Sequence, residues 1–252
     1  MQAIDTMIIP AAGYGTRMLK ITCGSSKELL EIGNKPALMY ALEEGVKANI
    51  KRAGIIIRKG KEDIIHAVRH DHRLSGIRKQ LHIDFFYQHT ATGEVGAIVM
   101  AEKWIGDLPF VVHYPDNISE ISGILDRLVN RFWEIQGDLV LLTSMLNHVQ
   151  ARPCGLCSLG NGLYQLQSDR VPTEFPYGLR PTGIYVATPA FLAACKKAVS
   201  KLQSQEIKDQ DIRRQMIACS IPVYGQDFSM HVFDTGNPAG YQLARSKFHG
   251  NG

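Results

Sequence analysis

Short apolar segments alternate with longer amphipathic segments through the first half of the chain. The short segments have the length and pattern of strands, and the longer ones have a helical period. The expected strands are Ala3–Pro10, Arg52–Arg58, Leu81–Gln88, Pro109–His113 and Asp138–Met145. The expected helices are Ala37–Ala48, Lys61–His70, Val95–Trp104 and Ile118–Ile135. This alternation predicts right-handed crossovers and an α/β fold, in which helices cover both faces of a Rossmann-like, mostly parallel, twisted sheet.

The second half has shorter strand patterns mixed with helices. The expected strands are Gly155–Leu159, Leu163–Leu166, Gly183–Ala187 and Met230–Phe233, and the expected helices are Ala190–Leu202, Lys208–Ala218 and Pro238–Lys247. This pattern predicts a small, mixed extension of the same sheet. No repeat, low-complexity segment or linker interrupts the sequence, so we expect one domain over residues 1–252.

A glycine-rich segment, Ala11-Ala12-Gly13-Tyr14-Gly15-Thr16-Arg17, directly follows the first predicted strand. Gly13 and Gly15 lack a Cβ atom, so backbone N–H groups can approach phosphate oxygens closely, and Arg17 adds a charged fork suited to phosphate. The dinucleotide fingerprint would need a third glycine at Met18, and a P-loop would need Gly-Lys-Ser/Thr. Tight strand-to-loop connections that bind nothing also carry such glycines.

Polar residues follow other predicted strands as well. Gln88 and the pair Pro115-Asp116 come just after strand ends, as the glycine-rich segment does. Ligands of open α/β sheets bind beyond the carboxyl ends of the strands, so we expect these residues along one rim.

Several motifs together resemble those of the sugar-1-phosphate nucleotidyltransferases. The matching residues are the glycine-rich segment, Ser26-Lys27-Glu28-Leu29-Leu30, Asn34-Lys35-Pro36 and Tyr40. The resemblance extends from about Met7 to Tyr241. It is strongest to the bacterial UTP–glucose-1-phosphate uridylyltransferases, and the chain is also similar to the glucose-1-phosphate thymidylyltransferases. It implies a GT-A-like fold, with a nucleotide-binding part over residues 1–146 and a sugar-phosphate and metal part over residues 147–252.

The resemblance also implies the substrates and their site. The expected reaction joins UTP, or next dTTP, to a hexose 1-phosphate, most simply glucose 1-phosphate, giving a nucleotide sugar and pyrophosphate. The implied catalytic residues are Arg17, Lys27 and Asp116. The implied nucleotide-binding residues are Ala11, Ala12, Gly13, Gly15, Thr16, Arg17, Gln88 and Gly93. Gln88 would pair with the base, because an amide matches the imide face of uracil or thymine.

A magnesium ion is the expected cofactor, with Asp116 and Asp234 as its ligands. Magnesium needs only one or two carboxylates, because water and phosphate oxygens complete its coordination. A single aspartate after a strand is more often a helix cap or turn residue. The two aspartates together resemble the metal pair of the family.

The implied sugar-phosphate site contains Lys27, Gly155, Glu174 and Arg180. This chain has Phe175 where the family has a lysine that meets the sugar phosphate, and Arg180, or less favourably Arg170, is our candidate for the missing charge. Ser26 stands where the family usually has proline, which we expect to loosen the loop that carries Lys27.

Composition adds a few constraints. The chain has a mild net charge of +4 with scattered basic residues, which argues against a nucleic-acid partner. The sequence opens directly into the first strand, contains no apolar run of membrane-span length and has five sparse cysteines. We therefore expect a cytoplasmic protein without a membrane partner, and a homo-oligomer remains open.

Two rival functions stay open at this stage. One is a nucleotidyltransferase that uses CTP, GTP or ATP, or an acceptor other than a hexose. The other is a non-catalytic relative that binds a nucleotide or sugar phosphate, and Phe175 and Ser26 favour it.

Overall fold

The computed structural model describes residues 3–135, 137–144, 155–167, 179–201 and 206–249. Its strands are β1 (Thr6–Pro10), β2 (Glu31–Ile32), β3 (Lys35–Pro36), β4 (Arg52–Ile57), β5 (His82–Tyr87), β6 (Phe110–His113), β7 (Asn117–Ser119), β8 (Asp138–Ser144), β9 (Gly155–Gly160), β10 (Leu163–Gln167), β11 (Leu179–Ala187), β12 (Val223–Asp227) and β13 (Val232–Asp234). Its helices are α1 (Leu19–Thr22), α2 (Ala37–Lys47), α3 (Glu62–His70), α4 (Ser75–Arg78), α5 (Gly93–Met100), α6 (Glu102–Ile105), α7 (Ile124–Ile135), α8 (Pro189–Lys201), α9 (Asp209–Ala218) and α10 (Pro238–His249).

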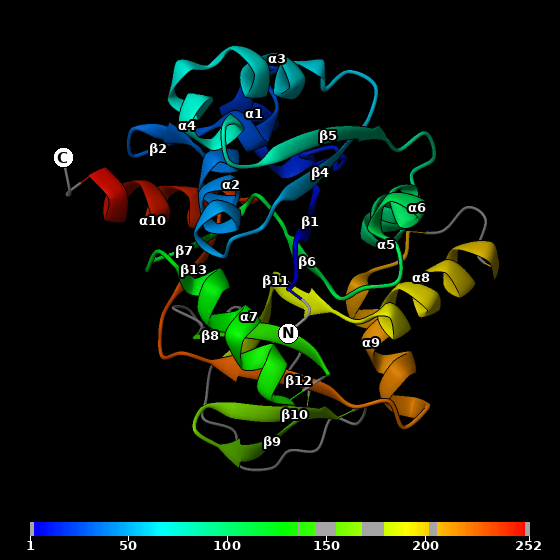
Figure 1. The fold of residues 1–252 in the computed structure, drawn as a ribbon. Coiled ribbons are helices and arrows are strands. Elements are labelled where there is room, and N and C mark those ends of the chain that lie inside the picture. Colours follow the sequence, from blue (N-terminus) through cyan, green and yellow to red (C-terminus); the bar gives the residue numbers. More distant parts are fainter. Residues whose placement is uncertain (1–2, 136, 145–154, 168–178, 202–205, 250–252) are drawn as a thin grey trace.

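A nine-stranded sheet in the order β5-β4-β1-β6-β11-β8-β12-β10-β9 runs through the molecule (Figure 1). Strands β5, β4, β1 and β6 are mutually parallel, as the first half of the sequence predicts. Strand β11 runs antiparallel to β6 and β8, and β10 runs antiparallel to β12 and β9, which gives the expected mixed extension. The α/β prediction with a mostly parallel sheet is confirmed.

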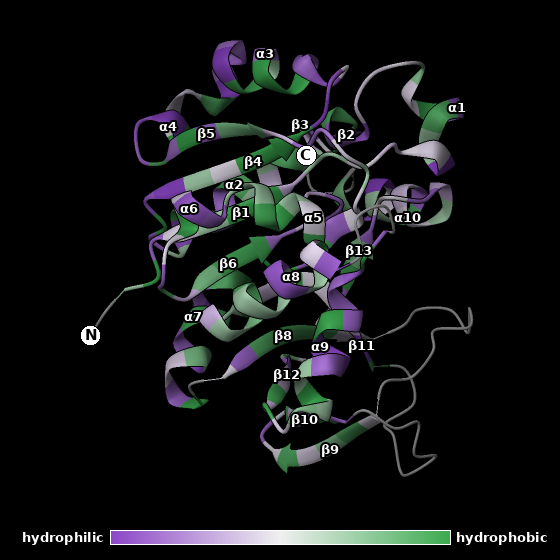
Figure 2. Ribbon diagram, turned by 90° about the vertical axis from the view of Figure 1, so that its right-hand side faces the viewer, coloured by the Kyte–Doolittle hydropathy of each residue, from purple (hydrophilic) through white to green (hydrophobic). Residues whose placement is uncertain are grey.

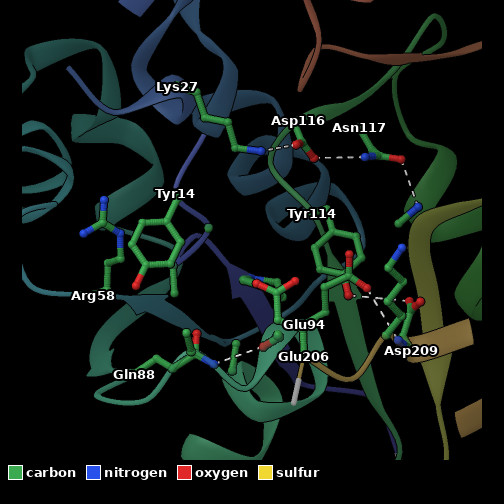
Figure 3. A pocket seen from close by; sticks show the side chains of 18 of the residues that line it. Tyr14, Lys27, Arg58, Gln88, Glu94, Tyr114, Asp116, Asn117, Glu206 and Asp209 are labelled. Atoms are coloured by element: carbon green, nitrogen blue, oxygen red, sulfur yellow. Dashed lines mark hydrogen bonds and ion pairs between the residues drawn. The ribbon is translucent and has the colours of Figure 1, made fainter. Parts of the chain in front are cut away.

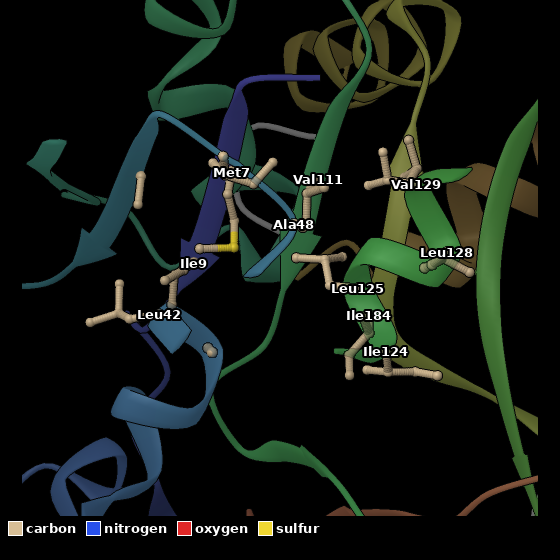
Figure 4. Close-up of a cluster of buried hydrophobic side chains, with 14 of the residues drawn as sticks. Met7, Ile9, Leu42, Ala48, Val111, Ile124, Leu125, Leu128, Val129 and Ile184 are labelled. Carbon is tan, nitrogen blue, oxygen red and sulfur yellow. The ribbon is translucent and has the colours of Figure 1, made fainter. Parts of the chain in front are cut away.

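Helices cover both faces of the sheet. One face packs on α2, α3 and α7 through an apolar cluster that includes Met7, Ile9 and Leu42 (Figure 4). The other face packs on α5, α8 and α9 through residues such as Ile8 and Phe191. Successive residues of β1 therefore point into opposite cores, and the strand is buried on both sides. Figure 2 shows the central strands between helices that carry both apolar and polar residues. None of the described helices combines the length and apolarity that crossing a bilayer requires.

The predicted helix Ile118–Ile135 is wrong in its first turn. Residues 117–119 form β7, which pairs with β13, because Ile118 packs against Phe233 in a small third core beneath α10. Helix α7 begins only after Gly123, whose φ of 82° interrupts any helix. The Glu44 side chain accepts hydrogen bonds from the N–H groups of Gly123 and Leu125, which compensates for the missing helical partners there.

The register of the parallel strands places their carboxyl ends level. Pro10 of β1 is opposite Ile56 of β4, and Ile57 of β4 is opposite Tyr87 of β5. The residues that follow these strands leave the sheet along one edge, where a ligand of an open α/β sheet is expected.

Candidate active site

A cavity of about 680 Å³ opens at this edge of the sheet (Figure 3). The residues predicted for the site that line it are Ala12, Gly13, Arg17, Lys27, Gln88, Gly93, Asp116, Arg180 and Asp234. They come from loops that are far apart in the sequence, and the parallel topology brings them together. The cavity contains cations, which can bind phosphate, carboxylates, which can hold a divalent cation, and an amide, which can bind a polar part of a ligand.

The glycine-rich segment forms one wall of the cavity. Gly15 has a left-handed φ of 64°, a conformation that is strained for a residue with a side chain. Gly15 also packs against the Lys27 side chain, whose Cδ would lie 3.6 Å from a Cβ added to the glycine. No atom would lie within 4 Å of a Cβ on Gly13, which is exposed at the cavity surface. The turn therefore supports the stem of Lys27 and presents backbone to the cavity.

Three of the predicted nucleotide-binding residues, Ala11, Gly15 and Thr16, do not line the cavity. Ala11 is buried, its N–H donates to the Ile56 carbonyl at 2.8 Å, and its carbonyl accepts a hydrogen bond from Lys61 Nζ. Both backbone groups of Ala11 are thus used within the protein, and the residue anchors the turn.

Lys27 and Asp116 form an ion pair at the cavity wall (Figure 3). Burial alone would lower the pKa of Lys27, but the negative charges of Asp116 and Glu28 outweigh it and raise that pKa. Burial would raise the pKa of Asp116, but the charge and hydrogen bond of Lys27, with a further bond from Asn117, hold it below its ordinary value. Both side chains are therefore charged at neutral pH.

Neighbouring residues orient Asp116. Asn117 Nδ2 donates to Asp116 Oδ1 at 3.0 Å, and Asn117 Oδ1 accepts from Gly183 N–H of β11 at 2.9 Å. The Asp116 carbonyl accepts hydrogen bonds from the N–H and hydroxyl of Thr235, at 2.7 and 3.1 Å. These bonds connect the strand end at Asp116 directly to the turn that carries Asp234.

Asp116 and Asp234 converge on one point. A Cβ on Gly236 would lie 2.5 Å from Asp116 Oδ2 and 3.1 Å from Asp234 Oδ1, so an added methyl would force the carboxylates to shift. Asp234 Oδ1 accepts a hydrogen bond from Gly236 N–H at 3.0 Å, which fixes its orientation. This geometry fits a hard divalent cation, since oxygen is its preferred ligand and a substrate phosphate can complete the set. In the part of the chain that the structure describes, no group of three or more His, Cys, Asp or Glu side chains could hold a metal ion, so a cation at these two carboxylates would need further ligands from water or substrate.

Gln88 lies at the opposite end of the cavity from Asp116 (Figure 3). Its Nε2 donates to the Gly93 carbonyl at 3.0 Å and to Thr92 Oγ1 at 3.3 Å. The network assigns the amide this orientation, which leaves Oε1 as an acceptor for a ligand. Gly93 has a φ of 75°, and a Cβ there would lie 2.8 Å from the backbone of Ile207. The Gly93 position therefore needs glycine for packing.

Three cations that line the cavity were not predicted from the sequence: Arg58, Lys59 and Lys208. Arg58 and Lys59 directly follow β4, and both line the cavity next to the glycine-rich segment. The Arg58 guanidinium lies over the Tyr14 ring, 4.3 Å from its centroid. Arg17 has no hydrogen-bond or ion-pair partner among the described residues, which leaves it free for an anion. The strand-end rule that pointed to Gln88 would also have found Arg58 and Lys59.

The wall formed by α5 and the start of α9 contains three carboxylates and one cation, Lys208. Glu94, Glu206 and Asp209 line it, together with Tyr114 (Figure 3). Burial, and then the nearby charge of Asp209, raises the pKa of Glu94 to about 7. The Asp209 carboxylate is paired with Arg213 at 3.2 Å, behind the cavity wall. Lys208 lines the same wall, so the wall carries charges of both signs.

The predicted sugar-side residues have three different positions. Arg180 lines the cavity at the start of β11. Gly155 begins β9 at the edge of the sheet, where it pairs with Gln167, and it does not line the cavity. Glu174, with Phe175 and Arg170, lies outside the described residues.

The expectation that Ser26 loosens the loop that carries Lys27 is wrong. Ser26 is buried, with an exposed fraction of 5%, and it makes two hydrogen bonds to Asp63. A proline here could not donate either of them. The loop that carries Lys27 is therefore fastened at Ser26.

Comparison with known proteins agrees with this geometry. The model of the nucleotidyl transferase family matches residues 6–249. The chain belongs to the nucleotidyl transferase family. This nucleotidyl transferase is 28% identical to a UTP–glucose-1-phosphate uridylyltransferase of Pseudomonas aeruginosa, over 94% of this chain and 93% of that protein. It is 26% identical to a glucose-1-phosphate thymidylyltransferase of Streptomyces griseus, over 91% of this chain and 62% of that protein.

Solved structures support the fold of this nucleotidyl transferase. A UDP-glucose pyrophosphorylase complexed with UDP-glucose matches it with a TM-score of 0.83 at 24% identity, covering 99% of this chain and 100% of that chain. A UTP-bound UGPase from Acinetobacter baumannii matches with a TM-score of 0.80 at 19% identity, covering 97% and 93%. The predicted resemblance and its class of enzyme, a nucleotidyltransferase, are confirmed.

Proposed function

We propose that this nucleotidyl transferase transfers a uridylyl or thymidylyl group from UTP or dTTP to a hexose 1-phosphate, with glucose 1-phosphate as the first candidate. The observation that carries the proposal is one cavity with an amide acceptor at one end and Lys27 beside the Asp116 and Asp234 carboxylates at the other. The names of the relatives support the same substrates, since they include both uridylyl- and thymidylyltransferases of glucose 1-phosphate.

The amide of Gln88 supports a uracil or thymine base. Its Oε1 accepts hydrogen bonds, and both bases present an N3–H donor, whereas cytosine presents a lone pair at N3. A mismatched pair leaves buried polar groups without partners, which is how such sites reject an analogue. We therefore expect CTP to be a poor substrate.

The reaction joins two anions. An oxygen of the sugar 1-phosphate attacks the α-phosphorus of the nucleoside triphosphate, a new P–O bond forms, and the bond from the α-phosphorus to the bridging oxygen breaks to release pyrophosphate. Lys27 would stabilise the charge on the α-phosphoryl group, and Arg17, Arg58 and Lys59 would bind the phosphates that leave. Such fixed positive groups lower the barrier because they are in place before the charge develops.

The proposed cofactor is a magnesium ion held by Asp116 and Asp234. When bound, it would neutralise phosphate charge and hold the two reactants in line. We also propose that residues 1–146 bind the nucleotide and that residues 147–252 supply the sugar side and Asp234.

The proposed location is the cytoplasm. The unpaired state of the described cysteines Cys23, Cys157, Cys195 and Cys219 supports it.

A substrate screen tests the proposal. UTP, dTTP, CTP, GTP and ATP are each mixed with glucose 1-phosphate and magnesium, pyrophosphate release is measured, and mass spectrometry identifies the nucleotide sugar. We expect UTP or dTTP to exceed CTP at least about tenfold in kcat/KM, the size of one unmatched hydrogen bond. Equal turnover of CTP would contradict the assigned role of Gln88. Nucleotide binding by calorimetry without pyrophosphate release from any acceptor would instead support a non-catalytic relative.

A further inference from the structure

The loop that carries Lys27 is fastened to the start of α3 by a forked contact. Ser26 N–H donates to Asp63 Oδ2 at 2.8 Å, and Ser26 Oγ donates to Asp63 Oδ1 at 2.7 Å. Two donors of one residue meet the two oxygens of one carboxylate, which fixes orientation as well as position. We name this contact the Ser26–Asp63 fork.

A second contact from the same segment holds the residue on the other side of Lys27. Lys61 Nζ donates to Glu28 Oε2 at 2.7 Å and to the Ala11 carbonyl at 2.7 Å. Lys61 and Glu28 are almost fully buried, with exposed side-chain fractions of 5% and 0%. The segment that begins α3 thus holds both flanks of Lys27 and the base of the glycine-rich turn.

Helix α3 is a firm support for these contacts. Ile64 and Val68 are buried in the core beneath the sheet, with exposed fractions of 0% and 2%. Asp63 Oδ1 also accepts a hydrogen bond from Ile64 N–H at 3.0 Å, so the carboxylate is held by its own helix. Asp63 does not line the cavity and therefore contacts no ligand there.

We propose that Asp63 is a positioning residue that acts through Ser26 to hold Lys27 Nζ in its reaction geometry. The proposal rests on the function proposed above. Lys27 has a flexible four-carbon stem, so the position of its ammonium depends on how firmly its backbone is held. A shift of about 1 Å in such a group can lower the rate about a hundredfold.

The backbone angles of Ser26 provide a discriminating variant. Its φ is −67° and its ψ is 133°, and the φ is the value to which a proline ring locks the backbone. Ser26→Pro would keep that angle by a covalent constraint while removing both donors of the fork. If the fork serves only to hold this backbone, Asp63 becomes unnecessary in the proline variant.

The kinetic test compares Asp63→Ala with wild type and with Glu62→Gln. Glu62 is the matched control, because it is the neighbouring carboxylate of α3 and accepts a hydrogen bond from Gly60 N–H on the exposed surface. We expect Asp63→Ala to lower kcat about a hundredfold with KM for the nucleotide within about twofold. Glu62→Gln should keep the wild-type kcat. An unchanged kcat in Asp63→Ala would overturn the proposal.

The double variant distinguishes positioning from general stability. In the Ser26→Pro background, Asp63→Ala should change kcat by less than about twofold, because the fork no longer exists there. A drop of the same size in both backgrounds would show that Asp63 acts by a route other than Ser26, and the proposal would be rejected. Ser26→Ala removes only the hydroxyl donor and should give a smaller loss than Asp63→Ala.

Hydrogen exchange of the ligand-free protein tests the fork without the reaction. Asp63→Ala should speed amide exchange across residues 26–30, and Glu62→Gln should not. Unchanged exchange in Asp63→Ala would overturn the proposal even if kcat fell. If the wild-type chain releases no pyrophosphate with any nucleotide and acceptor, the proposed function fails, and the exchange result alone then decides whether Asp63 holds this loop.

Discussion

Two adjacent residues, Lys27 and Glu28, each form a lysine–carboxylate pair, and the two pairs face opposite ways. Lys27 pairs with Asp116 at the cavity wall, where the side chains have exposed fractions of 15% and 16%. Glu28 pairs with Lys61 in the interior, where the fractions are 0% and 5%. The chemistry is the same, and only the surroundings differ.

The pKa shifts of the two pairs have opposite signs. At the cavity, the partners stabilise each other's charge, so the pKa of Lys27 is raised and that of Asp116 is lowered. In the interior, burial dominates, so the pKa of Glu28 is raised and that of Lys61 is lowered. Lys27 and Asp116 both stay charged at the cavity, so each can bind a ligand group in place of the other. Glu28 and Lys61 hold the chain in place. We infer that the first pair serves the reaction and the second serves the fold.

Lys61→Met should have the largest effect on stability. It leaves the Glu28 carboxylate and the Ala11 carbonyl buried without their shared partner, and breaking a buried pair costs about 3–5 kcal/mol. Urea unfolding measures the loss. The double variant Lys61→Met with Glu28→Leu should recover part of the loss, since no unpaired charge remains while the Ala11 carbonyl still lacks its donor. A loss below about 1 kcal/mol in the single variant would contradict the structural role of this pair.

Lys27→Met should instead affect turnover. Removing one donor that stabilises the transition state lowers kcat about a hundredfold to a thousandfold. The unfolding free energy should change little, because the side chain faces the cavity and Asp116 keeps its bond from Asn117. A large loss of stability with normal kcat would reverse the roles assigned to the two pairs.

Asp138→Asn should change stability in a pH-dependent way. Burial raises the pKa of Asp138 to about 6, and its Oδ2 has no hydrogen-bond partner, although Oδ1 accepts from Thr188 N–H at 2.6 Å. The folded state therefore favours the protonated form, and wild-type stability is lost as pH rises from about 4 through 6. This penalty reaches about 3 kcal/mol at pH 8 and about half of that at pH 5.

Urea unfolding at the two pH values checks this expectation. Asparagine keeps the acceptor for Thr188 and cannot ionise, so its stabilising effect should be greater at pH 8 than at pH 5. The exposed residue Asp107 provides the control, and Asp107→Asn should show no such difference. The same gain at both pH values would show that ionisation of Asp138 is not the cause.

Gly236→Ala should have the smallest effect of the four. The added methyl would lie 2.5 Å from Asp116 Oδ2 and would push apart the two carboxylates, and we expect a loss of about tenfold to a hundredfold in kcat. Gly76→Ala in α4 is the matched control, because no atom lies within 4 Å of its added Cβ. Equal activity of both variants would argue that the carboxylates do not act as a pair.

The sequence pattern predicts most of the parallel half of the fold, because β1, β4 and β6 are apolar and almost wholly buried. It misses β7, because a strand of three residues is too short to show an alternating pattern. It also misses β12, whose Gly225 packs against the Leu142 side chain and weakens the strand pattern. Pairing with distant strands decides both elements, and a local pattern carries no information on it.

The candidate site was predictable where a motif or a strand end pointed to it, as for Lys27, Gln88 and Asp116. The residues that support the site were not. Lys61 and Asp63 are 33 and 37 residues from their partners Glu28 and Ser26, and in the sequence they are ordinary charges at the start of a helix. Only the packing of α3 against the sheet brings them beneath the Lys27 loop.

The central claim is that Asp116 and Asp234 together bind a magnesium ion. The magnesium dependence of pyrophosphate release tests this claim most directly. Pyrophosphate is measured while magnesium is titrated into wild type, Asp116→Asn and Asp234→Asn, with UTP and glucose 1-phosphate present. We expect magnesium-dependent release by wild type and none by either variant. Retained turnover in both variants would contradict the assignment of these two aspartates.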